Sequence, residues 1–449
     1  MKPSKANMKH GQSMLARVSA AAVLVTAPVA TLHAQGLGSP NAPAEIRIMA
    51  NEAFASTWQT QLVPEFNKRF PNVKVVIDGV PYAELLPKMM LDAINADPEY
   101  DVLVIDDPWV PQLAAIGALA DLKNKDVAAI TSADYDWADF NAAPLAAGEW
   151  KGMQYAVPVR SNMLLMFYNR TLYKKAGVPE PTPKLTWNEF FTQAKTLVQD
   201  TNGDGKEDAW AVDTYFVRDS LTPTIWQAIL NSNGGKLLDQ SGAPAFNNEV
   251  GAKALDMHKD LAKYGPPGVL GHGYSEALQA FRQGKVAVMF NWGSVYKATA
   301  IDANSTTLKE DEVGIQVMPV GTDRAGTHRG VWNAGISSKT ENLAASWAFL
   351  QWLSSKEGEK INASLLGSFP ARKSTLGSKP DEKWLEPVYR TLQQSYELAA
   401  EGEMWRIRSP KSNAAQQVLA DEVARAIAGQ VSSKEALQAA ATRIKSTLK

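Results

Sequence analysis

The segment at 102–107 reads Val102-Leu-Val-Ile-Asp-Asp107, four consecutive apolar residues that run into two carboxylates. An unbroken apolar run of this length is typical of a strand buried on both faces, as in parallel sheets covered by helices. Strand-like runs also stand at 45–49 and 73–77, and helical patterns stand at 58–70 and 82–94. This alternation predicts an α/β fold with a largely parallel, buried sheet.

Polar and aromatic residues stand at the predicted carboxyl ends of these strands. In open α/β sheets, ligands bind in the crevice beyond those ends. The candidates for ligand contact at this edge are Asn51, Glu52, Asp106, Asp107 and Trp109. Because neighbouring side chains on a strand point to opposite faces, at most one of the two aspartates is expected to face a ligand directly. The other is equally well explained as the cap of the next helix.

Composition and the amino terminus predict an exported protein. The chain has 449 residues, 45% of them hydrophobic and 21% charged, which is typical of a globular protein with two or more domains. Residues 1–34 hold four basic and no acidic residues and a small-apolar run, as in a cleavable signal peptide, and 35–44 read as a flexible leader. The absence of cysteine excludes disulfides and a lipidated cysteine. We therefore expect a periplasmic location. The 42 basic and 47 acidic residues that follow the signal peptide argue against nucleic acid as a partner.

A second motif, Asp200-Thr-Asn-Gly-Asp-Gly-Lys-Glu-Asp208, is similar to the first part of an EF-hand calcium loop, with Gly205 where such a loop turns. The predicted ligands are side-chain oxygens and one backbone carbonyl, from Asp200, Asn202, Asp204, Lys206 and Asp208. The twelfth position, normally a bidentate glutamate, is Ala211, so a remote carboxylate would have to complete a structural Ca²⁺ site. A solvated turn between a helix and a strand explains the segment equally well.

A series of short motifs then follows in order over roughly 400 residues. They are Tyr155-Ala-Val-Pro158, Phe167-Tyr-Asn-Arg170, Lys175-Ala-Gly-Val-Pro179, Thr186-Trp-Asn-Glu-Phe190, Trp226 with Gly234-Gly235, Phe281-Arg-Gln-Gly-Lys-Val-Ala-Val-Met289 with Trp292, Ser346-Trp-Ala-Phe-Leu350, Phe369-Pro-Ala-Arg372 and a helix at 435–445. No single motif is specific. Their order and spacing resemble the extracellular solute-binding proteins of ABC importers, in the sugar-binding group that includes maltose-binding protein.

The resemblance implies two α/β lobes, a multi-strand hinge and a ligand cleft between the lobes. It implies a protein without catalytic activity, expected to be a monomer, that closes around its ligand and delivers it to a membrane permease. Crossings of the chain between lobes are expected near Pro158, Trp332 and Arg372. The predicted lobes are residues 45–158 with 332–372, and residues 159–331 with 373–449.

A sugar presents hydroxyl groups on its rim and C–H patches on its faces, so its site needs aromatic platforms and paired hydrogen-bonding groups. The predicted platforms are Trp226, Trp292, Trp332 and Trp405, although a tryptophan at any of these positions is also compatible with core packing. The predicted hydrogen-bonding groups, besides the strand-end residues, are Arg160, Asn162, Asn333 and Arg372, with Arg406 and Arg408 as candidates for the rim. Because the arginines are dispersed along the sequence, a neutral carbohydrate or polyol is favoured over a phosphate-bearing ligand.

Two other functions are compatible with the sequence. A secreted carbohydrate-active hydrolase or lyase needs two carboxylates at a fixed separation, and carboxylates are plentiful. Against it, no Ser-His-Asp or His-x-x-x-His motif is present, and the histidines beyond the signal peptide are His258, His272 and His328. A periplasmic sugar-sensing subunit that reports to a receptor would have the same fold as a transport protein.

Overall fold

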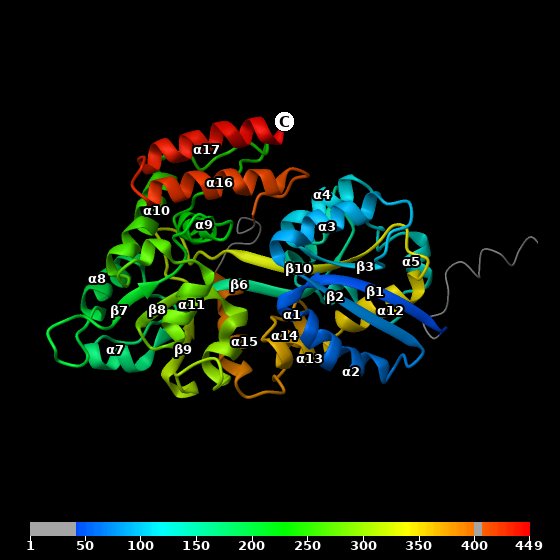
Figure 1. Ribbon diagram of the computed structural model, residues 1–449, viewed down its shortest axis with the longest axis horizontal. Helices are drawn as coiled ribbons and strands as arrows, with labels where there is room; N and C mark the ends of the chain where they lie inside the picture. Colours follow the sequence, from blue (N-terminus) through cyan, green and yellow to red (C-terminus); the bar gives the residue numbers. More distant parts are fainter. Residues whose placement is uncertain (1–41, 399–405) are drawn as a thin grey trace, which may run out of the picture. The chain divides into compact units, whose positions relative to one another are not determined.

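The computed structural model describes residues 42–398 and 406–449, so the predicted signal peptide and Trp405 lie outside the described residues. The main sheet has eight strands in the order β2-β1-β3-β10-β6-β8-β7, with β9 beside β6 (Figure 1). Its strands are β1 (Ala44–Asn51), β2 (Val73–Val80), β3 (Val102–Asp106), β6 (Val157–Asn169), β7 (Trp210–Asp213), β8 (Val286–Trp292), β9 (Val313–Gln316) and β10 (Arg329–Ile336). A separate hairpin pairs β4 (Glu149–Trp150) with β5 (Met153–Gln154).

The α-helices lie mostly between these strands and after the last of them. They are α1 (Glu52–Thr57), α2 (Val63–Asn67), α3 (Tyr82–Ile94), α4 (Val110–Ala115), α5 (Lys125–Ala129), α6 (Ala142–Ala146), α7 (Arg170–Ala176), α8 (Trp187–Leu197), α9 (Thr222–Ser232), α10 (Glu249–Leu261), α11 (Tyr274–Arg282), α12 (Leu343–Leu353), α13 (Lys356–Leu366), α14 (Lys373–Leu376), α15 (Leu385–Leu398), α16 (Ser412–Ile427) and α17 (Ser433–Leu448). Across residues 42–398 and 406–449, no helix has the length and hydropathy that a membrane span would require.

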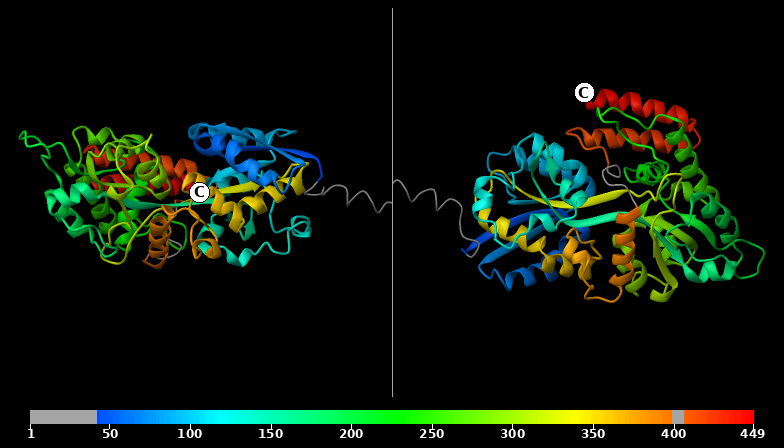
Figure 2. Two further views of the ribbon diagram at one scale, coloured as in Figure 1. Left: turned by 90° about the horizontal axis from the view of Figure 1, so that it is seen from below. Right: turned by 180° about the vertical axis from the view of Figure 1, so that it is seen from behind.

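The sheet is mixed, which corrects the expectation of a largely parallel sheet. β1 runs parallel to β2 and β3, and β7 runs parallel to β8, whereas β6 and β10 run antiparallel to each other and to their other neighbours. The first part of β6 pairs with β10, and its last part, from Leu164, pairs with β8. β6 and β10 therefore pass between the two halves of the molecule, as both views in Figure 2 show. Because they carry the chain in opposite directions, they pair antiparallel.

The first half buries both faces of its strands under helices. Helices α1, α2 and α12 contribute to the core on one face, and α3 and α4 contribute to the core on the other. Along β3, Val102 and Val104 belong to the first core, whereas Leu103 and Ile105 belong to the second. This two-sided burial explains why residues 102–105 are all apolar and show no polar alternation.

The second half repeats this arrangement with other helices. Its larger core contains residues of α7, α8, α9, α10, α16 and α17, and its smaller core contains residues of α11 and α15. Capping boxes begin two of these helices: Thr186 with Glu189 starts α8, and Ser432 with Glu435 starts α17. Such caps satisfy backbone N–H groups that the first turn of a helix leaves free.

Candidate functional site

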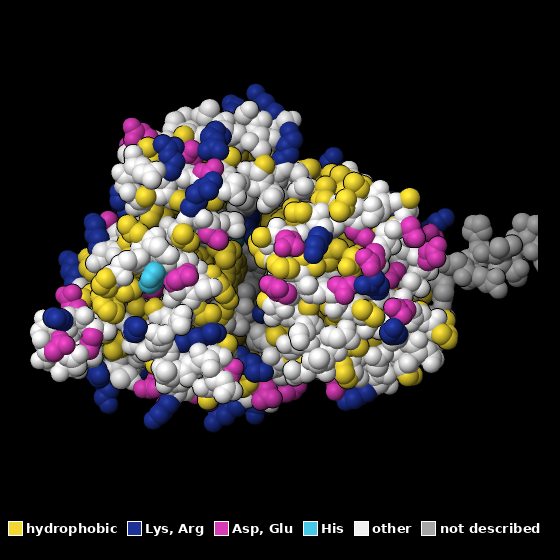
Figure 3. All heavy atoms as spheres, viewed as in Figure 1, with side chains coloured by type: hydrophobic (Ala, Val, Ile, Leu, Met, Phe, Trp, Pro, Cys, Tyr) yellow, Lys and Arg dark blue, Asp and Glu magenta, His cyan; other side chains and the backbone are white. Residues whose placement is uncertain are grey.

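A cavity of about 440 Å³ opens where β6 and β10 pass between the halves, beside the carboxyl ends of β1 and β3. Figure 3 shows the groove between the halves, with apolar side chains on its walls. The aromatic residues that line the cavity are Phe54, Tyr82, Tyr274, Trp292 and Trp332. Its polar lining residues are Asn51, Asp106, Arg160, Asn162, Arg282, Ser294 and Arg406. Six residues predicted from the sequence for ligand contact are among them: Asn51, Asp106, Arg160, Asn162, Trp292 and Trp332.

Arg406 connects the segment before α16 to the end of β3. Its Nη1 donates to Asp106 Oδ2 at 2.8 Å, and its Nη2 donates to Asp106 Oδ1 and to Asp107 Oδ1, both at 2.5 Å. Tyr82 donates its hydroxyl to Asp106 Oδ2 at 2.7 Å. The guanidinium and both carboxylates are almost fully buried. Because one cation faces two carboxylates, this cluster carries a formal charge of −1 at the cavity wall.

The electrostatics of this cluster follow from burial and pairing. Burial raises the pKa of Asp107 to about 6, although Arg406 acts in the opposite direction. Burial alone would lower the pKa of Arg406, but the charges of Asp106 and Asp107 raise it above its ordinary value. The arginine therefore stays charged and anchors the carboxylates.

The two aspartates do not point to opposite faces of β3, as alternation along a strand predicts. Asp106 ends β3, and its Oδ1 accepts the backbone N–H of Asp107 at 3.1 Å, which starts the short 3-10 helix Asp107–Trp109. Asp107 has thus already left the strand, and both carboxylates turn toward Arg406. Asp106 lines the cavity, whereas Asp107 lies behind it, fully buried, and accepts from Val331 N at 3.2 Å.

Two tryptophans form the apolar part of the site. Trp332, on β10, meets Phe54 edge to face at a centroid distance of 5.3 Å. Trp292 ends β8, and its ring lies over Gly330, where an added Cβ would come within 3.0 Å of the indole. Trp109 is buried behind Tyr82 and Trp332 and supports them, since it does not reach the cavity.

Three polar residues on β1 and β6 complete the wall. Arg160 donates from Nε to Ser368 Oγ at 3.0 Å, and its guanidinium lies 5.3 Å from the ring centroid of Phe54. The amide of Asn162 is paired with Ser294, donating to its hydroxyl at 2.8 Å and accepting from its backbone N–H at 3.1 Å. Asn51 caps α1 through its side-chain oxygen. The neighbouring Glu52, in the first turn of α1, is exposed and outside the lining.

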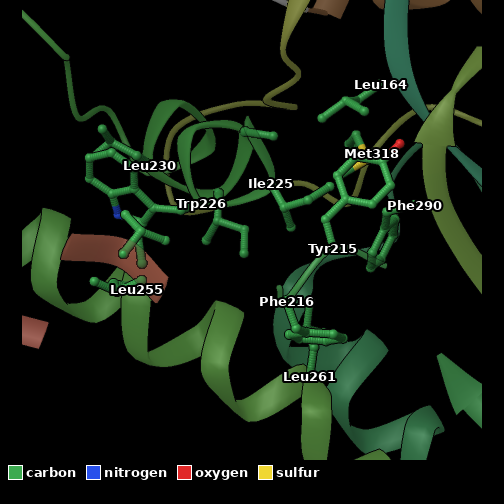
Figure 4. Packing of buried hydrophobic residues seen from close by; sticks show 14 of the residues in the cluster. Leu164, Tyr215, Phe216, Ile225, Trp226, Leu230, Leu255, Leu261, Phe290 and Met318 are labelled. Carbon is green, nitrogen blue, oxygen red and sulfur yellow. The ribbon is translucent and has the colours of Figure 1, made fainter. Parts of the chain in front are cut away.

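Besides Glu52, Asp107 and Trp109, the structure places three more of the predicted ligand contacts away from the cavity. Trp226 is fully buried in the core around α9, where its Nε1 donates to Gly251 O at 3.1 Å (Figure 4). Asn333 is fully buried and donates to Val331 O at 3.2 Å. Arg372 is also buried: its Nη1 donates to Asp136 O at 2.8 Å, and its guanidinium lies 4.0 Å from the Phe140 ring centroid. Each has its partners inside the fold.

Three aromatic residues and one arginine of the lining were not predicted from the sequence. They are Phe54, Tyr82, Tyr274 and Arg282. Phe54 follows the end of β1, Tyr82 follows the end of β2, and Tyr274 is the first residue of α11. The three aromatic residues could therefore have been predicted from their positions just after strands or at the start of a helix. Arg282, in the last turn of α11, could not have been predicted in this way.

The calcium-like loop is closed by its own hydrogen bonds. Asp200 accepts backbone N–H groups from Gly203 at 2.6 Å and Gly205 at 2.7 Å, and Asp208 accepts the backbone N–H and the hydroxyl of Thr201. In the part of the chain that the structure describes, no group of three or more acidic, histidine or cysteine side chains comes together to hold a metal. The loop as described does not fit a calcium cage, because the closing carboxylate is missing. Calcium binding there stays a prediction.

The comparisons with known proteins agree with this fold. The family model for the bacterial extracellular solute-binding protein matches residues 51–360. The chain belongs to this family. Its fold is the two-lobe fold of periplasmic binding proteins, in which a ligand cleft lies between the lobes.

Two relatives and one solved structure are associated with different ligands. A probable amino-acid ABC transporter periplasmic-binding protein of Sinorhizobium fredii is 24% identical over 335 residues, which cover 74% of this chain and 73% of the relative. The mannitol-binding protein of Pseudomonas aeruginosa is 26% identical over 243 residues, covering 52% and 53%. The crystal structure of an ABC transporter solute-binding protein from Agrobacterium radiobacter K84 in complex with ribitol has a TM-score of 0.76 and 26% identity, over 91% of this chain and 100% of that chain.

Proposed function

We propose that this member of the family captures a sugar or polyol in the cavity between its lobes and delivers it to the permease of an ABC importer. The observation that carries the proposal is the convergence of Trp292 and Trp332 with Asp106 and Arg160 on one cavity of about 440 Å³. Indole faces suit the C–H patches of such a ligand, and charged groups suit its hydroxyls. Similarity to a protein named mannitol-binding protein and to a solute-binding protein solved in complex with ribitol supports this class of ligand.

The mechanism that we propose is closure of the two lobes around the ligand. Moving a two-state protein from about 1% to 99% closed needs roughly 5.5 kcal/mol of differential affinity. Hydrogen bonds to charged groups contribute about 1.5–3 kcal/mol each. Two or three such bonds, made by the ligand to Arg160 beside Phe54 and to Arg282 on α11 only when the cleft is shut, therefore supply enough.

The proposal also covers the boundaries of the two lobes and the location of the protein in the cell. The lobe boundaries are supported by the separate cores, although Ala363 and Phe369, placed in the N-terminal lobe by sequence, pack in the second half. We infer that the protein works as a monomer in the periplasm after removal of its signal peptide. The proposed lobes are residues 45–158 with 332–372, and residues 159–331 with 373–449.

A binding role is also preferred over hydrolysis. Asp106 is the one carboxylate among the described residues that line the cavity, and Arg406 already holds it. A glycosidase needs two carboxylates on opposite sides of the bond that it cleaves. Incubation of the pure protein with oligosaccharides should therefore release no new reducing ends, and their release would favour the enzyme.

Calorimetry with a panel of sugars and polyols tests the binding role. Replacing the half-buried platform by Trp332→Ala should weaken binding about 10- to 100-fold, because a stacked ring contributes about 1.5–3 kcal/mol. Trp226→Ala is the matched control: it should lower the free energy of unfolding by about 3–5 kcal/mol and leave the affinity of the folded protein unchanged. Unchanged affinity in Trp332→Ala, or a panel without any binder, would contradict the proposal.

A further inference from the structure

Two of the three arginines that line the cavity make no ion pair with any described residue, although the charge of Asp302 acts on Arg282 from beyond ion-pair distance. Arg406 is held by Asp106 and Asp107, as described above. For Arg160 and Arg282, no acidic side chain of the described residues lies within ion-pair distance. Both residues line the same cavity. The arginines are dispersed along the sequence, which favoured a neutral ligand, but the fold brings three of them to one cavity.

Arg160 is held in place without being neutralised. Ser368 accepts its Nε, and the Phe54 ring covers part of the guanidinium, but both partners are uncharged. Its Nη1 and Nη2 donate to no described residue, and neither is fully buried. These two groups are the pair that bonds an oxyanion in parallel. Burial lowers the pKa of Arg160 to about 10, so the group is still charged at neutral pH.

Arg282 is the second arginine near Tyr274. It lies in the last turn of α11, the helix that Tyr274 starts, and its Nε is buried with no hydrogen-bond partner. The charges of Arg160 and Arg282 both act on the Tyr274 hydroxyl, lowering a pKa that burial raises. The two arginines and the tyrosine thus form one donor-rich corner of the cavity.

Cations withdrawn from water without a counter-ion are unfavourable, and an anion that enters the cleft relieves that penalty. Arginine is also the side chain best suited to planar, two-point recognition of carboxylate or phosphate. Resting on the function proposed above, we propose that this cavity selects sugars or polyols that carry a carboxylate or phosphate group. Arg160 and Arg282 bind the acidic group, and Trp292 and Trp332 contact the carbon skeleton.

Matched ligand series test this selection by calorimetry and thermal shift. Each series contains a neutral compound, its sugar acid and its phosphate ester, for example glucose, glucuronate and glucose 6-phosphate, or mannitol, mannonate and mannitol 1-phosphate. In at least one series we expect an acidic member to bind at least 10-fold more tightly than the neutral one, with an advantage that shrinks at high salt. The carboxylate and phosphate arms show which oxyanion is preferred.

The variants Arg160→Gln and Arg282→Gln assign the effect to these side chains. Each should weaken binding of the acidic compound about 10- to 100-fold and leave any binding of its neutral counterpart nearly unchanged. The control is Arg69→Gln, which removes an exposed arginine that pairs with Glu357 and does not line the cavity. It should leave both affinities unchanged.

The outcomes separate this proposal from the function on which it rests. Equal binding of neutral and acidic members, or acid preference that survives in both Gln variants, would overturn acid selection and leave sugar or polyol binding intact. Binding of acids without hydroxyl groups, such as succinate, together with no binding of any sugar or polyol, would instead overturn the proposed function.

Discussion

At the scale of single residues, Arg406 shows how a buried charge organises the cavity wall. Its guanidinium makes three hydrogen bonds to Asp106 and Asp107, and the carboxylates in turn accept from Tyr82 and from the backbone of β10. A buried ion cluster of this kind adds little to the net free energy of unfolding, because desolvation offsets much of the attraction between its charges. Its main effect is to fix the positions of the side chains in the cavity wall. Removing one partner is different, since it leaves the other charges uncompensated.

The variant Arg406→Met should therefore lower the free energy of unfolding by about 3–5 kcal/mol at pH 7. The two remaining carboxylates would take up protons more readily, so the loss should be smaller at pH 5 than at pH 7. Urea denaturation at both pH values measures this. Arg218→Met removes an arginine from an exposed pair with Asp421, and should change stability by less than about 1 kcal/mol. A loss as small for Arg406→Met would show that the cluster is not needed for the fold.

At the scale of elements, local signals and long-range pairing differ in how well they could be predicted. The bounds of α3 match the predicted range 82–94, because apolar periodicity and terminal signals act within a few residues. The antiparallel placement of β6 and β10 was not predicted. It depends on which strand lies beside which, and residues far apart in the chain decide that.

Helix α13 contains a buried carboxylate, Glu359, that connects this helix to a later segment of the chain. Glu359 accepts the backbone N–H groups of Ala371 at 2.7 Å and Arg372 at 3.1 Å, which ties α13 to the segment where a crossing between lobes is predicted. Burial raises the pKa of this carboxyl to about 7 from an ordinary value of 4.5. The folded protein therefore keeps this proton at pH values where the unfolded chain has lost it.

From this shift we predict a pH dependence that Glu359→Gln should remove. Because the folded state binds more protons between about pH 4.5 and 7, the contribution of Glu359 stabilises the fold at low pH and is lost as the pH rises through that window. The glutamine keeps the acceptor oxygen but does not titrate. The stability difference between variant and wild type should thus change by on the order of 2 kcal/mol between pH 5 and 8. A constant difference in urea denaturation across this range would mean that the Glu359 pKa is not raised.

At the scale of the whole molecule, the cavity lies between two halves that have separate cores and share β6 and β10. Few strands at the crossing leave the halves free to rotate, whereas each core resists deformation because it is close-packed. Ligand binding is therefore expected to move the lobes as rigid bodies.

We predict that the panel compound with the largest thermal shift reduces the radius of gyration in small-angle X-ray scattering. The same concentration should cause a smaller decrease in Trp332→Ala, because fewer molecules are liganded. A saturating concentration should restore the full decrease if the ring contributes to affinity alone. No change in the wild type at saturation would contradict closure.

The amino-acid sequence was sufficient to predict an α/β fold with ligand contacts at strand ends, and Asp106 and Trp292 lie at such ends and line the cavity. It could not separate Trp332, which faces the cavity, from Trp226, which is fully buried in a core. Nor could it show that Arg160 and Arg282 line the same cavity while Arg406 is neutralised. Strand and helix patterns come from burial and capping within a few residues, so they can be predicted from neighbouring residues alone. Which side chains meet across a cleft depends on packing between distant segments, and that information is absent from any local pattern.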